Sequence, residues 1–144
     1  VLWESEHGPR GGDELNTIEK GLNYGWPKIT YGIKYIGTKI TDYTHLEGME
    51  QPIWHWTPSI AVCGIKVYEN DLIPSWNGNI LVTSLKYEFL ERVIIKNGER
   101  IGSEKIYNAD SRVRDVEVCP KGVIYVALED PGRIVKIFPF SKNF

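Results

Sequence analysis

The stretch from residue 112 to residue 138 reads RVRDVEVCPKGVIYVALEDPGRIVKIF and holds three short apolar runs separated by two turns. Apolar and polar residues alternate in the first run, and Val and Ile recur in the others, which is typical of β-strands. The turns are Pro120-Lys121-Gly122 and Asp130-Pro131-Gly132, which favour tight reversals of the chain. Residues 112–140 are therefore predicted to form three consecutive strands.

The preceding stretch, residues 59–107, repeats this pattern with four β-type runs. The runs lie at residues 60–68, 80–82, 89–95 and 103–107. Lys96-Asn97-Gly98-Glu99 separates the last two, and Asn-Gly is the strongest short signal for a two-residue hairpin turn. The stretch predicts a four-stranded unit.

Four-stranded units repeated around an axis form a β-propeller, so the expected fold is all-β and a propeller. A last unit of three strands is expected when its fourth strand comes from the other end of the polypeptide. Because propellers typically need at least four blades to close, we expect this chain to be the C-terminal part of a single, larger propeller domain. The strand pattern alone also leaves a β-sandwich open.

Composition narrows the function classes. The 144 residues include 17 basic and 19 acidic side chains, a formal net charge of −2, which gives no basic field for nucleic acid. No apolar run approaches the ~20 residues that span a bilayer. Cys63 and Cys119 are far apart and form no metal or redox motif, which favours two small buried side chains over a disulfide.

Residues 4–16, ESEHGPRGGDELN, and residues 23–27, NYGWP, are dense in Gly, Pro and Asn. Because Gly and Pro interrupt helices and strands, we expect a long ordered loop over residues 1–58, with at most a short helix at residues 13–21. Long loops in compact domains are usually functional. This loop offers carboxylates and many main-chain carbonyls to a cation.

The sequence HGPRGGDELN, followed by GLNYGWP, resembles the soluble aldose sugar dehydrogenases that use pyrroloquinoline quinone (PQQ), within the glucose/sorbosone dehydrogenase family. The resemblance continues, in the family's order, at Pro58-Ser59-Ile60-Ala61, Thr83-Ser84-Leu85-Lys86, Arg112-Val113-Arg114-Asp115 and Pro131-Gly132-Arg133-Ile134-Val135-Lys136. It implies a six-bladed propeller, of which this chain supplies about two blades plus a long loop. It also implies oxidation of the anomeric carbon of sugars to lactones, with an external electron acceptor.

The resemblance implies two calcium sites. The main-chain oxygens of Gly8 and Pro9 would hold the calcium that bridges to PQQ. Glu14 would hold a second, structural calcium together with the main-chain oxygen of Tyr24. Calcium suits such oxygen ligands. The alternatives are an ordinary turn at Gly8–Pro9 and a stabilising role for Glu14 at a helix N-terminus.

By their match to the family's motifs at residues 84–86 and 112–115, the resemblance implies three cations as cofactor ligands: Lys86, Arg112 and Arg114. PQQ is a tricarboxylate, and Arg can grip a carboxylate with two parallel hydrogen bonds. Residues 112 and 114 project to the same face of a strand, although exposed surface arginines are the alternative reading. The resemblance adds Tyr35 and Ser59 as cofactor contacts.

The sequence shows no catalytic base. In the family a histidine upstream of the HGP motif takes the proton, and His7, His45 and His55 do not match it. The chain alone is therefore expected to be inactive, its partners being the rest of the propeller, a sugar and an electron acceptor. A homodimer is left open, and a periplasmic or extracellular location is implied by the family.

Two other functions remain open. One is a calcium-stabilised propeller that binds a partner without catalysis, which would not need Lys86, Arg112 and Arg114 together. The other is a hydrolase that uses Asp13 and Glu14. Neighbouring residues of a strand project to opposite faces, and no nucleophile–base pair is visible, so this reading is disfavoured.

Overall fold

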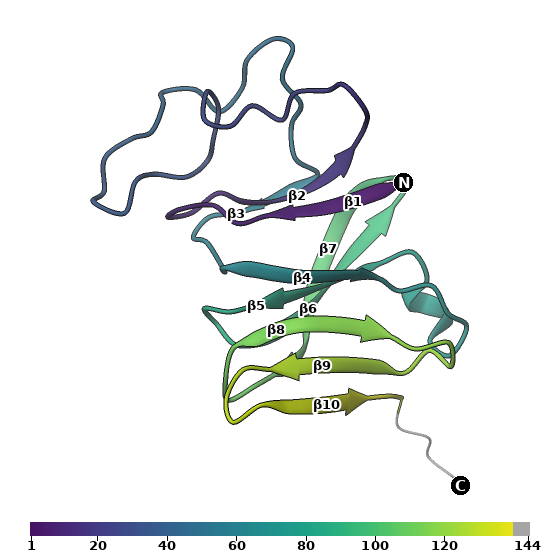
Figure 1. Cartoon of the computed structure of the whole chain (residues 1–144). Helices are drawn as coiled ribbons and strands as arrows, with labels where there is room; N and C mark the ends of the chain where they lie inside the picture. The colour runs from purple at the N-terminus through teal and green to yellow at the C-terminus, as the bar shows by residue number, and fades with distance from the viewer. Residues whose placement is uncertain (140–144) are drawn as a thin grey trace, which may run out of the picture. The chain divides into compact units, whose positions relative to one another are not determined.

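A computed structural model describes residues 1–139. The chain divides into two compact units, Val1–Val62 and the residues from Cys63 onward. All sheets in the described range are antiparallel, and the one helix is a single 3₁₀ turn, η1 (Pro74–Trp76) (Figure 1). No helix among these residues is long and apolar enough to cross a membrane. The all-β prediction is confirmed.

The first unit is built on a three-stranded sheet with the order β1-β2-β3. The strands are β1 (Leu2–Glu6), β2 (Asp13–Ile18) and β3 (Trp54–Trp56). Leu15, in the central strand, is fully buried and pairs across to Trp54. Between β2 and β3 the chain runs from residue 19 to residue 53 without a strand, so the loop expected over residues 1–58 is interrupted by these three strands.

The expected helix at residues 13–21 is wrong, because residues 13–18 form a strand instead. Residues 4–16 also contain parts of two strands, although their Gly and Pro content argued against any. The Gly and Pro residues are confined to the connection between β1 and β2, residues 7–12. β2 forms a strand because it pairs with β1 on one side and β3 on the other, although its own residues have a weak preference for a strand.

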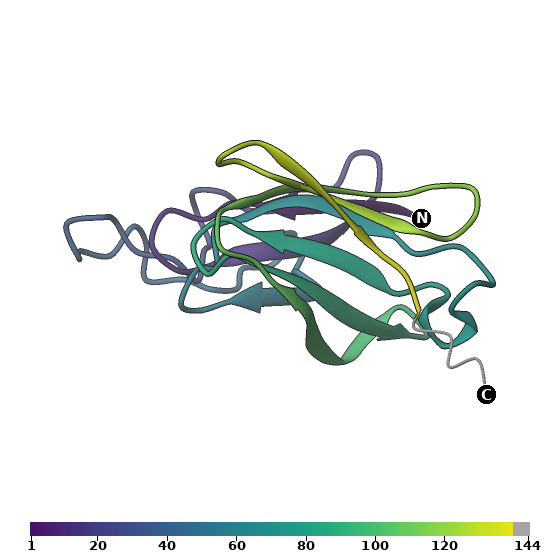
Figure 2. The same ribbon diagram turned by 90° about the horizontal axis from the view of Figure 1, so that it is seen from below.

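The second unit contains the two sheets that the turn pattern predicted. One has the order β4-β5-β6-β7 and the other the order β10-β9-β8. The strands are β4 (Val62–Val67), β5 (Ile80–Ser84), β6 (Phe89–Lys96), β7 (Glu99–Asn108), β8 (Val113–Val118), β9 (Ile124–Leu128) and β10 (Arg133–Ile137). Within each sheet, strands that are consecutive in sequence are neighbours, and they twist relative to one another (Figure 2).

Local turn chemistry sets the register of the second unit. Asn97 and Gly98 both have positive φ, of 54° and 83°, between the paired residues Lys96 and Glu99. This is the geometry that a two-residue hairpin turn requires. A bulge between Val113 and Asp115 interrupts the alternation of β8.

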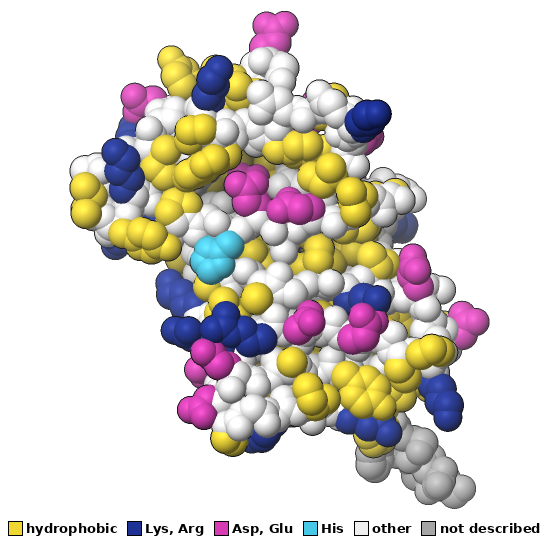
Figure 3. Space-filling view, viewed as in Figure 1, with side chains coloured by type: hydrophobic (Ala, Val, Ile, Leu, Met, Phe, Trp, Pro, Cys, Tyr) yellow, Lys and Arg dark blue, Asp and Glu magenta, His cyan; other side chains and the backbone are white. Residues whose placement is uncertain are grey.

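One apolar core lies between the two sheets of the second unit. Its buried members come from both sheets: Tyr68, Leu81, Leu90, Val113, Val116, Ile124, Val126 and Leu128. The Tyr68 hydroxyl, buried with this core, donates a hydrogen bond to the main-chain oxygen of Gly122 at 2.9 Å. The molecular face in Figure 3 carries basic, acidic and apolar side chains, with several basic side chains next to one another at the left of the view.

Candidate functional site

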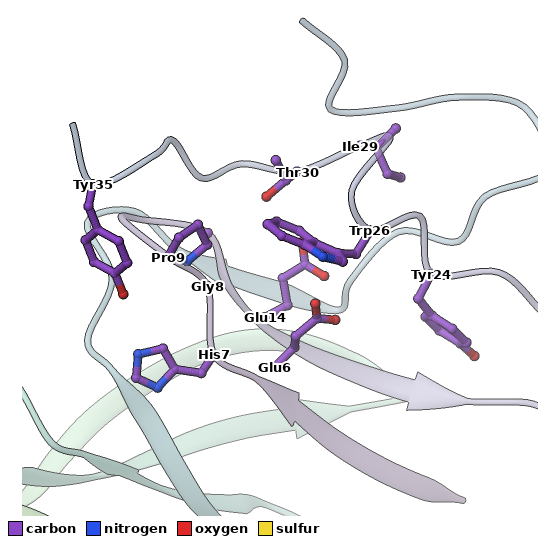
Figure 4. A pocket seen from close by; sticks show the side chains of 11 residues that line it. Glu6, His7, Gly8, Pro9, Glu14, Tyr24, Trp26, Ile29, Thr30 and Tyr35 are labelled. Carbon is purple, nitrogen blue, oxygen red and sulfur yellow. The ribbon is translucent and has the colours of Figure 1, made fainter. Parts of the chain in front are cut away.

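The first unit carries a pocket of about 340 Å³. It is lined by Glu6, His7, Gly8, Pro9, Gly12, Glu14, Tyr24, Trp26, Ile29, Thr30 and Tyr35 (Figure 4). The structure thus brings together all four predicted calcium-binding residues and one predicted cofactor contact, Tyr35. These residues come from β1, β2, their connection and the long segment that follows.

The connection between β1 and β2 is packed against neighbouring backbone. A Cβ atom at Gly8 would lie 2.5 Å from the main-chain oxygen of Gly11, so only glycine fits. The Gly12 amide donates to the Trp56 carbonyl at 2.9 Å, and the Ile33 amide donates to the Arg10 carbonyl at 3.1 Å. These contacts fix the course of the Gly8–Pro9 turn, and Pro9 fixes its own φ.

Acidic side chains gather on one face of the β1–β2 pair. Glu6 lies directly opposite Glu14, and Glu4 lies opposite Asn16. The Asn16 amide nitrogen donates to Glu4 Oε2 at 3.2 Å and to Glu14 Oε2 at 3.5 Å. In Figure 4, Glu6 and Glu14 point toward the ring of Trp26.

Burial makes the charge on these carboxylates costly. Burial is the largest cause that raises the pKa of Glu14 from its ordinary 4.5 to about 7; the hydrogen bond from Asn16 opposes the shift, and the nearby charges of Glu6 and Glu4 add to it. Burial, followed by the charge of Glu4, also raises the pKa of Glu6. A bound cation would relieve this repulsion.

The donor set of the pocket fits a calcium ion. No Lys or Arg side chain lines the pocket, while two carboxylates and the main chains of Gly8 and Pro9 do. The buried Asn16 Oδ1 has no hydrogen-bond partner in the described structure, so a further oxygen beside the carboxylates is unsatisfied. Within residues 1–139, no group of three His, Cys, Asp or Glu side chains could hold a metal ion. Main-chain oxygens would therefore have to complete the ligand set, which calcium accepts.

We predict that Glu14→Gln stabilises the metal-free protein at pH 8. Between about pH 4.5 and 7 the folded protein keeps a proton at Glu14 that the unfolded chain has lost, so the free energy of unfolding falls as the pH rises. Removing the charge should recover about 1 to 2 kcal/mol, after a discount for solvent screening at a half-buried group. Urea unfolding in a chelator at pH 8 measures this gain.

The same substitution should have two further signatures. Near pH 4 the gain should vanish, because Glu14 is then protonated in both states. With calcium present at pH 8 its sign should reverse, because the variant has lost a calcium ligand. An equal gain in the free energy of unfolding at pH 4 and pH 8 would show that the charge of Glu14 does not destabilise the metal-free protein.

Several aromatic side chains surround this site, and the structure separates those in the pocket from those outside it. Tyr24, Trp26 and Tyr35 line the pocket, with Tyr35 73% exposed. Trp54 and Trp56 do not line it, and Trp56 is buried. Trp26 was missed as a site residue, although it belongs to the NYGWP motif.

The three histidines have different surroundings. His7 lines the pocket beside Gly8. The His55 ring stacks on Tyr31, with 3.8 Å between ring centroids and 5° between planes, and burial lowers the pKa of His55. His45 does not line the pocket. Neither His45 nor His55 is placed to act on a ligand there.

Ser59 does not line the pocket, and its role as a cofactor contact stays a prediction. Its hydroxyl is buried, donates to Asp13 Oδ1 at 2.7 Å and accepts from the Ala61 amide at 3.0 Å. The sequence could not reveal this, because Asp13 is 46 residues away.

The predicted cations lie in the second unit. Arg112 and Arg114 are both exposed and both pair with Glu129 Oε2, at 3.7 Å and 2.9 Å. The two side chains thus meet at one carboxylate, although Arg112 precedes β8 and the bulge lies beside Arg114. Lys86 lies in the exposed bend between β5 and β6, where its Nζ is 4.9 Å from the centroid of the Tyr87 ring.

Glu129 is a functional candidate that the sequence did not point to. The hydrogen bond from Arg114 lowers the pKa of Glu129. Exposed ion pairs of this kind contribute little to stability, because solvent screens the charges. The two arginines are therefore held in place but can exchange Glu129 for another carboxylate at little cost.

The chain is similar to known sugar dehydrogenases. The family model for glucose/sorbosone dehydrogenases matches residues 1–136. Aldose sugar dehydrogenase YliI of Escherichia coli is 40% identical over 144 residues, covering 96% of this chain and 38% of that protein. The crystal structure of a glucose dehydrogenase superposes with a TM-score of 0.90 at 33% identity, covering 96% of this chain and 41% of that one.

A further solved structure is the PQQ-bound form of an aldose sugar dehydrogenase from Streptomyces coelicolor. Its TM-score is 0.69 at 25% identity, with 94% of this chain and 39% of that one covered. The chain thus spans about 40% of the length of these relatives. Their structures are propellers, so the sheets described above are part of a β-propeller. The chain belongs to the glucose/sorbosone dehydrogenase family.

Proposed function

We propose that this chain is part of a PQQ- and calcium-dependent dehydrogenase, which oxidises the anomeric carbon of aldose sugars to a lactone. The observation that carries the proposal is the pocket of the first unit, where Gly8, Pro9, Glu14 and Tyr24 lie together. The family match and the PQQ-bound relative support it.

The pocket residues would hold the metal. The main-chain oxygens of Gly8 and Pro9 would bind the calcium that contacts the cofactor, and Glu14 with the Tyr24 carbonyl would bind a second calcium. The exposed ring of Tyr35 offers a flat apolar wall to a planar ligand. PQQ would supply an ortho-quinone that accepts a hydride, equivalent to two electrons and one proton, from the sugar.

The second unit would supply positive charge. Arg112 and Arg114 would bind carboxylates of the cofactor through paired N–H groups, and Lys86 would add a compact charge. The general base is proposed to be a histidine outside these 144 residues. An external acceptor would then take the electrons, and export to the periplasm or beyond is part of the same proposal.

Reconstitution tests this function. The protein is expressed from its complete gene, stripped of metal, and assayed for aldose-dependent dye reduction with PQQ and calcium, PQQ and chelator, or calcium alone. We expect dye reduction and lactone formation only with PQQ and calcium together. Calcium binding without PQQ binding or dye reduction would instead indicate a calcium-stabilised binding module.

A further inference from the structure

Asp13 is the most completely buried charged residue beside the pocket, with 0% exposure, yet it does not line the pocket. It stands at the first position of β2, and its side chain lies on the opposite face from Glu14. Three groups donate hydrogen bonds to its carboxylate. They are the Gly8 amide at 2.9 Å and the Ser59 hydroxyl at 2.7 Å, both to Oδ1, and the Val62 amide at 3.0 Å, to Oδ2.

These bonds connect the Gly8–Pro9 turn to the end of the first unit, whose last residue, Val62, is also the first residue of β4. Ser59 and Val62 lie 46 and 49 residues along the chain from Asp13. Ser59 is itself fixed, because its hydroxyl also accepts from the Ala61 amide. Asp13 therefore links the Gly8 amide to residues 59–62 by hydrogen bonds, which restrains the position of that amide.

The hydrogen bond of the Gly8 N–H group restrains the conformation of the turn. Glycine alone fits at this position but has the greatest conformational freedom of any residue. Pro9 restrains the turn on one side through its fixed φ, and the bond to Asp13 restrains it on the other. Together they determine where the carbonyl oxygens of Gly8 and Pro9 point.

We propose that Asp13 is a positioning residue, which holds the Gly8–Pro9 turn in the conformation that binds calcium. The inference rests on the function proposed above. It assigns no contact between Asp13 and the metal or the cofactor. Hydrogen-bonded partners of this kind, one step removed from the metal, typically change metal affinity by about 10- to 100-fold when they are removed.

Calcium-linked PQQ binding tests this role. PQQ absorbance is titrated against the full gene product at graded calcium concentrations, which gives the calcium concentration for half-maximal binding. Asp13→Asn should raise that concentration by about 10- to 100-fold, because the amide cannot accept all three bonds. Saturating calcium should restore the wild-type PQQ affinity, an effect that a merely structural role would not produce.

Asn79→Ala is the matched control. Asn79 is a buried residue of the second unit whose Oδ1 accepts from the Ile95 amide at 3.1 Å, and it belongs to none of the proposed ligand sets. Its loss should lower the free energy of unfolding without changing the calcium midpoint.

If Asp13→Asn does not fold, the Ser59→Ala variant tests the positioning role instead, since it removes one hydrogen bond to Asp13 and leaves the carboxylate. It should raise the calcium midpoint by several-fold.

The outcomes are separable. An unchanged calcium midpoint in Asp13→Asn, or in Ser59→Ala where that variant decides, overturns the positioning role. So does a loss of PQQ binding that calcium does not restore. Wild-type protein that binds no PQQ at any calcium concentration overturns the proposed function, and the role of Asp13 with it.

Discussion

Replacing Arg112 and Arg114 together by alanine should weaken PQQ binding by about 100-fold or more. Each guanidinium can give a carboxylate charge-assisted hydrogen bonds, worth about 1.5 to 3 kcal/mol when they form to a charged group. A carboxylate of the cofactor can replace Glu129 as their partner at little cost in free energy, because all three side chains are 39 to 58% exposed. The affinity is measured by PQQ absorbance at saturating calcium.

The arginine pair also has a matched control. Arg133→Ala removes another partly exposed arginine of the second unit, which is paired with Asp110 and is not a proposed ligand. Its PQQ affinity should stay within about threefold of wild type, since a screened charge at a distance contributes little. A double variant that binds as tightly as Arg133→Ala would remove these arginines from the cofactor site. The losses of PQQ binding free energy in the two single variants should not add up to the loss in the double variant, because the two arginines share Glu129.

Gly12→Ala should destabilise the protein by about 3 to 5 kcal/mol, among the largest effects of any single substitution. Gly12 has a φ of +70°, where a side chain is strained. A Cβ atom there would also lie 2.5 Å from the main-chain nitrogen of Gly32 and 2.8 Å from the carbonyl carbon of Tyr31. Backbone atoms cannot move aside as a flexible side chain can. Urea unfolding, followed by circular dichroism, measures the loss.

Gly21→Ala separates the two causes of that loss. Gly21 belongs to the same unit and has a φ of +89°, but nothing lies within 4 Å of its missing Cβ. It should lose only the conformational part, about 1 to 2 kcal/mol. Equal losses in the two variants would show that crowding by the backbone of Tyr31 and Gly32 contributes nothing to the loss at Gly12.

The second unit could be predicted from the sequence because turn residues bound its strands. Asn97-Gly98 marks the turn between β6 and β7, and Asp130-Pro131-Gly132 marks the turn between β9 and β10. The first unit was harder, since β3 has only three residues and the Gly and Pro residues of the connection obscured β1 and β2. These strands are specified by pairing across the sheet, which no local pattern reports.

The candidate site divides in the same way. The motif residues Gly8, Pro9, Glu14 and Tyr24 could be selected from the sequence, and the structure gathers them in one pocket. The contacts of Asp13 and Glu129 could not, because their partners are distant in sequence or depend on the register of β8 and β9. The hydrogen bond of Ser59 to Asp13 was likewise not predicted, and its cofactor contact stays a prediction.

The most direct test of the account is a crystal structure of the full gene product with calcium and PQQ, with the metal located by its anomalous scattering. We expect a calcium peak about 2.3 to 2.6 Å from the main-chain oxygens of Gly8 and Pro9, and we expect Arg112 and Arg114 to contact the carboxylates of the cofactor. A calcium-loaded structure without metal at Gly8–Pro9, or PQQ bound away from these residues, would contradict it.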